Sequence, residues 1–186
     1  MRLAAEVVAL ARQAFASLLP EAGPARPPRV RVVIGDTPQP VGSAYLLASR
    51  EVRIERRHLD RLNLAHETSH ALLHGRLGFP PPVWFDEALA QLVAYRVVHG
   101  KDLAPPPGRP VGDFAKLRAL HGASWQEAGP AGYADSALWL GWLLPSGPAP
   151  AAEKAAFARW FDRLVRECDP AACDSELAVV DRGARR

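Results

Sequence analysis

The sequence predicts an α+β fold, because strand-like patterns lie early in the chain and helical patterns fill the remainder. Alternating apolar residues mark strands at about 29–34 and 51–55, and a short apolar run marks another at about 45–48. After residue 57, apolar residues recur mostly at helical spacing. Because the strands are grouped, the pattern favours a small N-terminal mixed sheet over alternating βαβ units.

The first segment is expected to be a packed amphipathic helix at about 3–19. Glu6 and Arg12 interrupt its apolar stretch, so the continuous apolar core of a signal peptide is missing. Apolar side chains instead recur at helical spacing, at Leu3, Val7, Leu10, Ala14, Phe15 and Leu18. We therefore expect a cytoplasmic protein, and leave open an export signal removed before residue 1.

Length and composition favour one globular domain over residues 1–186. The chain is 48% hydrophobic and 23% charged, which is usual for a protein with its own core. No apolar run approaches the roughly 18 residues that span a bilayer. The net charge of +3 is milder than that of a typical nucleic-acid-binding face. We expect neither a membrane nor a nucleic-acid partner, and leave open a partner chain or homo-oligomer.

Within this domain we expect a helix and sheet at 1–57, a helix pair at 58–98, and a helical part at 99–186. Helices are predicted at about 58–76, 82–98, 113–120, 132–144 and 151–167. Loops rich in proline or glycine are expected at 20–28, 35–43 and 102–112, and a frayed tail at 183–186. Cys168 and Cys173 are expected to be reduced thiols, with a local disulfide as the alternative.

The strongest chemical signal is the run His66-Glu67-Thr68-Ser69-His70 on a predicted helix. Residues four positions apart share a helix face, so both imidazoles can reach one divalent cation. Glu67 stands next to the first imidazole, where it can accept a proton from an activated water molecule. The alternative is a surface helix with two solvated histidines, because so short a pattern also occurs by chance.

The next predicted helix offers a third ligand. Glu87 lies in its first turn and could complete three protein ligands with a position left for water. Its alternative role is a first-turn carboxylate favoured by the helix dipole. Asp86 could orient a ligand imidazole. His74 lies about 12 Å along the helix axis from His66, so one cation cannot bind both, and it is expected to support the site or to be exposed.

The two patterns together resemble a known family. His66-Glu67-x-x-His70 followed by Trp84-x-x-Glu87-x-Leu89-Ala90 is similar to the gluzincin metallopeptidases, and most similar to their peptidase-MA-like domains. Ala88 stands where that family usually has glycine. The resemblance covers roughly residues 30–145 and implies a zincin-like fold with an active-site helix.

The resemblance also implies a function, that of a zinc-dependent peptidase acting on peptide or protein substrates. Glu67 would be the general base and proton shuttle, and Tyr133 the candidate donor to the oxyanion. The strand at 51–55 would be an edge strand that holds an extended substrate. One Zn²⁺ would be bound by His66, His70 and Glu87.

A different function class stays open from the sequence. Compact metal-binding domains of the ImmA/IrrE type act in regulation through repressor cleavage or binding, and the leucines after His70 resemble them slightly. Such a regulatory or interaction domain would show little general proteolysis. A helical domain with an accidental motif is the third alternative.

Overall fold

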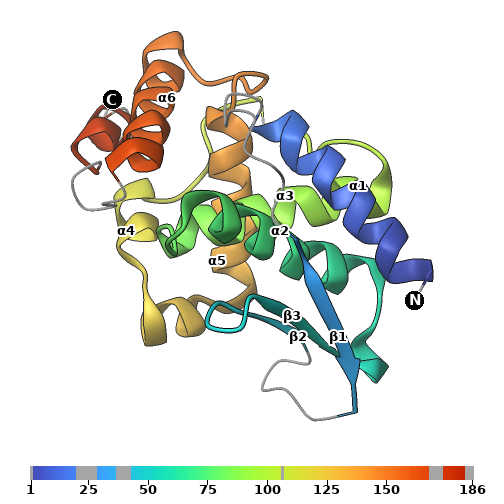
Figure 1. The fold of residues 1–186 in the computed structure, drawn as a ribbon. Helices are drawn as coiled ribbons and strands as arrows, with labels where there is room; N and C mark the ends of the chain where they lie inside the picture. Colours follow the sequence, from blue (N-terminus) through green and yellow to red (C-terminus); the bar gives the residue numbers. More distant parts are fainter. Residues whose placement is uncertain (1, 20–28, 37–42, 106, 168–173, 183–186) are drawn as a thin grey trace. The chain divides into compact units, whose positions relative to one another are not determined.

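Figure 1 shows the fold in a computed structural model, which describes residues 2–19, 29–36, 43–105, 107–167 and 174–182. The loop expected at 20–28, both cysteines and the C-terminal tail lie outside the described residues. The chain groups into two compact units, residues 1–80 with 89–103 and residues 81–88 with 104–186. The expectation of a single domain stays a prediction.

The first unit contains a helix, a sheet and a second helix in chain order. Helix α1 spans Arg2–Leu18, and strands β1, β2 and β3 span Arg31–Gly35, Ser43–Leu46 and Glu51–Glu55. A 3₁₀ turn, η1 (Arg56–His58), leads into helix α2 at Arg61–Leu77. Early strands followed by mostly helical structure confirm the predicted α+β class.

The sheet of the described residues is mixed and has the strand order β1-β3-β2. Strand β1 pairs with β3 in parallel, with Val32 opposite Val52. Strand β2 pairs with β3 antiparallel, with Tyr45 opposite the same Val52. The strand at 51–55 is therefore central, and the expectation that it is an edge strand was wrong.

The charges on β3 explain this error. Alternating Glu and Arg side chains are typical of a half-exposed strand, but Glu51 and Glu55 are only 6% and 4% exposed. Each carboxylate is paired with arginine instead, Glu51 with Arg31 at 2.9 Å and Glu55 with Arg57 at 2.6 Å. A hydrogen bond from Arg53 lowers the pKa of Glu51, although burial acts in the opposite direction.

Helix α1, whose apolar residues form one stripe, packs against α2 (Figure 1). The buried residues of that stripe are Val7, Ala11, Ala14, Phe15 and Leu18. The predicted amphipathic helix is confirmed, with bounds that differ by one residue at each end. Helix α2 also contacts β2 and β3, so the sheet as well as α1 packs against it.

Helix α3 (Val83–His99) begins in the second unit and continues in the first. The second unit also contains α4 (Phe114–Ala119), α5 (Gly122–Leu143) and α6 (Ala151–Glu167). A 3₁₀ turn, η2 (Asp174–Leu177), and the short helix α8 (Ala178–Arg182) follow. The sequence predicted α3, α4 and α6 closely, but missed η2 and α8.

Helix α5 begins ten residues earlier than the predicted start at 132. Gly129 has non-helical backbone angles (φ 51°, ψ −143°) and is followed by Pro130, which kinks the element. Proline lacks the amide hydrogen that a helix interior uses, so the pair indicates a helix boundary in the sequence. In the structure helical backbone continues on both sides of the kink.

An aromatic cluster fixes the first turn of α3. Trp84 lies 5.1 Å from Phe114 and 5.3 Å from Trp160 between ring centroids, and Phe85 lies 5.1 Å from Trp160. Trp84, Phe85 and Trp160 are at most 1% exposed. Aromatic pairs at these separations stabilise beyond the area that they bury, so the segment just before Glu87 is held firmly.

Among the described helices, none combines the length and apolar character required to cross a membrane.

Candidate metal centre

Helix α2, which carries the H-E-x-x-H motif, is closed at both ends by side-chain and backbone contacts. Asp60 caps its start by accepting a hydrogen bond from the Asn63 amide at 2.7 Å. Gly78 closes its end in the left-handed region (φ 81°), where its amide donates to the His74 carbonyl at 2.8 Å. These caps define where the helix that presents the histidines begins and ends.

An unusual set of polar side chains is buried on α2. Glu67 and His70 are 8% exposed, His74 is 9% exposed, and Thr68 and Ser69 are almost fully covered. Charged and polar side chains are seldom buried unless they are paired or bind a ligand. The concentration of such groups on one helix therefore indicates a functional site.

His66 and His70 are arranged as a chelating pair. Their Nε2 atoms lie 3.1 Å apart, and their rings lie 4.8 Å apart between centroids at an interplanar angle of 79°. Two nitrogens bound to one tetrahedral zinc at about 2.0–2.1 Å would lie about 3.3 Å apart. The two imidazoles therefore already stand close to the separation that a shared cation requires.

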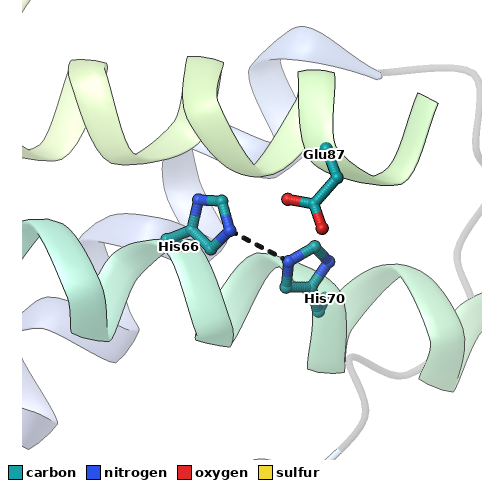
Figure 2. A group of neighbouring side chains, drawn as sticks. All are labelled: His66, His70 and Glu87. Carbon is teal, nitrogen blue, oxygen red and sulfur yellow. Dashed lines mark hydrogen bonds between the residues drawn. The ribbon is translucent and has the colours of Figure 1, made fainter. Parts of the chain in front are cut away.

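Glu87 completes a three-ligand group. The ligand atoms of His66, His70 and Glu87 all lie within 4.8 Å of one another. Figure 2 shows the Glu87 carboxylate pointing from α3 toward the two imidazoles on α2. Two imidazoles and one carboxylate are a donor set that zinc commonly takes in catalytic sites. These three residues, singled out from the sequence, thus form a group that could hold a metal ion.

A second group adjoins the first. Ligand atoms of His70, His74 and Asp86 also lie within 4.8 Å of one another. The His70 and His74 rings are 6.2 Å apart between centroids, and the His74 ring meets Tyr45 edge-on at 5.2 Å. His74 therefore does not join His66 at one cation, as the helix rise predicted, but it does lie in a cluster with metal-ligating groups.

Glu67 has a hydrogen-bond partner that the sequence did not reveal. The Ser43 hydroxyl on β2 donates to Glu67 Oε1 at 3.0 Å, and the bond is buried. Ser43 is 5% exposed. The two residues are 24 positions apart, and Ser43 follows a stretch of sequence rich in glycine and proline, where a serine is unremarkable. No signal in the sequence could have linked them, because the contact depends on how β2 packs on α2.

Tyr133 lies on α5, after the kink. Its ring meets Trp125 edge-on at 5.4 Å between centroids, and the side chain is half-buried. This packing accounts for an aromatic residue at the position. The role of Tyr133 as a donor to an oxyanion stays a prediction.

Comparison of the chain with models of known protein families, with curated proteins and with solved structures found no significant match. The resemblance to gluzincins therefore stays a prediction, and the functional argument rests on the residues and their geometry.

Proposed function

We propose that the chain is a zinc-dependent peptidase in which His66, His70 and Glu87 hold one Zn²⁺ and Glu67 is the general base. The observation that supports this most directly is the approach of the three ligand groups to within 4.8 Å of one another. Zinc in a three-ligand site lowers the pKa of water to about 7 and polarises a carbonyl group.

Glu67 would move the proton. Its position next to His66 in the sequence lets it accept a proton from the attacking water and deliver it to the departing amine. The hydrogen bond from Ser43 engages Oε1 and leaves Oε2 for this transfer. Burial favours the reaction further, because a carboxylate shielded from bulk water interacts more strongly with nearby charge.

The substrate would bind along β2. Among the described strands β2 is an outer one, so it takes the place first assigned to the strand at 51–55. An extended peptide can pair with an outer strand through main-chain hydrogen bonds. Ser43 and Tyr45 on β2 already contact Glu67 and His74 on α2, which supports binding close to the general base. Tyr133 is retained as the proposed donor to the oxyanion.

Low exposure supports a second candidate, a metal-binding regulatory or interaction domain with little general proteolysis. Glu67 and His70 are each only 8% exposed, which limits the approach of a peptide to these groups. A site of this kind would hold zinc as firmly as an enzyme but would cleave unselected peptides slowly.

Zinc content and peptide cleavage, measured on the same preparations, test both candidates. Wild-type protein is expected to hold about one zinc per chain and to cleave quenched peptides. His70→Ala should lose the metal. Glu67→Gln should keep zinc and lose activity by about 10²-fold or more, because general-base catalysis contributes that much.

His99→Ala is the matched control for His70→Ala, since His99 is an exposed residue at the end of α3. Stoichiometric zinc in His70→Ala, or full activity in Glu67→Gln, would exclude the proposed peptidase. If zinc binding depends on His70 but the wild-type protein cleaves no peptide, the result would support the regulatory candidate instead.

A further inference from the structure

We propose that α2 and the first turn of α3 provide a second cation position, formed by His70, His74 and Asp86, which overlaps the triad of His66, His70 and Glu87. The inference starts from the same cluster as the proposed function, but it concerns metal binding alone. The occupant would be a divalent cation of intermediate softness such as Zn²⁺, which accepts imidazole and carboxylate ligands together.

The spacing of the histidines supports two positions rather than one. His66, His70 and His74 recur every four residues, so each neighbouring pair shares a helix face one turn apart. The outer two are separated by about 12 Å along the axis and cannot bind the same cation. Each neighbouring pair, however, has its own carboxylate, Glu87 for the first and Asp86 for the second.

The environment of the second group suits a metal. His70 and His74 are 8% and 9% exposed, and Asp86 is half-buried. A neutral imidazole can donate a nitrogen lone pair to a cation, and a carboxylate can supply an oxygen ligand. The ligand atoms lie within 4.8 Å of one another, compared with about 3.3 Å around a tetrahedral zinc, so small side-chain rotations would close the group.

His70 belongs to both groups, and this makes the positions mutually exclusive. A neutral imidazole has one nitrogen with a free lone pair, so it serves one cation at a time. The wild-type chain should therefore bind a single cation. Removal of His66 would shift that cation by four residues, about 6 Å along the axis of α2.

Zinc titration of metal-free variants, by calorimetry and by competition with a chromophoric chelator, tests the second position. The His66→Ala variant should still bind about one zinc. Its affinity should be roughly tenfold or more higher than that of His66→Ala/His74→Ala, because changes around a metal site typically lower metal affinity by that factor. Cobalt substitution should give His66→Ala a visible spectrum distinct from that of wild type, because the ligand set differs.

The matched control is His66→Ala/His99→Ala, which removes the same number of imidazoles and should bind like His66→Ala. Far-UV circular dichroism in chelator confirms that each variant is folded. Equal zinc affinity of His66→Ala and His66→Ala/His74→Ala would overturn the second position, as would absence of zinc binding by wild type. Failure of the proposed function would give a different result. The His66→Ala variant would still bind zinc, but the wild-type protein would cleave no peptide.

Discussion

Ser43 is the residue whose contribution follows most directly from one contact, its hydrogen bond to Glu67 Oε1 at 3.0 Å. A hydrogen bond to a charged group contributes about 1.5–3 kcal/mol, and here it also fixes the direction of the carboxylate. We predict that Ser43→Ala lowers kcat of the proposed peptidase by roughly tenfold and leaves KM and zinc content unchanged. Steady-state kinetics and metal analysis measure the three quantities.

Two variants show whether Ser43 acts by positioning the Glu67 carboxylate. Ser43→Thr keeps the hydroxyl and should restore most of kcat. Ser17→Ala removes a serine that bonds to the Ala14 carbonyl within α1, and should leave kcat unchanged. A fall in zinc content together with kcat would mean that Ser43 supports the fold of the site rather than the orientation of Glu67.

At this scale, local patterns found the candidate ligand residues. His66 and His70 were singled out because residues four positions apart share a helix face, and Glu87 because a catalytic zinc takes a third protein ligand. The structure brings the ligand atoms of all three together. Asp86 was expected to orient a ligand imidazole, and it lies near His70 and His74. The hydrogen bond between Ser43 and Glu67 was missed because it joins a strand to a helix, and no local sequence pattern indicates such a contact.

At the scale of elements, helices were predicted better than the arrangement of strands. The bounds of α6 and β3 match the expected ones, since each pattern is carried by its own residues. The place of β3 in the sheet was wrong, because strand order depends on pairing between distant segments. The start of α5 was missed because Gly129 and Pro130 locally indicate a boundary, whereas surrounding helical structure tolerates the kink.

The N-cap of α2 gives a prediction about an element. Asp60 accepts hydrogen bonds from the Asn63 amide at 2.7 Å and from Asn63 Nδ2 at 2.8 Å. Loss of an N-cap side chain costs about 1 kcal/mol. Asp60→Ala should therefore lower the free energy of unfolding by about that amount, measured by urea denaturation. Asp60→Ser keeps a capping oxygen and should stay near wild type; identical midpoints for Asp60→Ala and wild type would contradict the role of the cap.

At the scale of the whole molecule, the candidate metal centre should link zinc binding to the free energy of unfolding. A cation held by His66, His70 and Glu87 would have ligands on α2 and on α3, which are separated along the chain by residues 78–82. Because the unfolded chain does not preform this group, zinc should favour the folded state.

The expected size follows from mass action. Free zinc at a hundredfold excess over Kd should raise the free energy of unfolding by about 2.7 kcal/mol. In a chain of this length, about 1 kcal/mol shifts Tm by roughly 2–4 °C, so zinc should raise Tm by about 5–10 °C and a chelator should reverse the rise. Magnesium at the same concentration should have little effect, since it prefers oxygen ligands in octahedral geometry. His70 belongs to both proposed cation positions, so the Tm of His70→Ala should not change with zinc. A rise in Tm equal to that of wild type would place the stabilising zinc elsewhere on the chain.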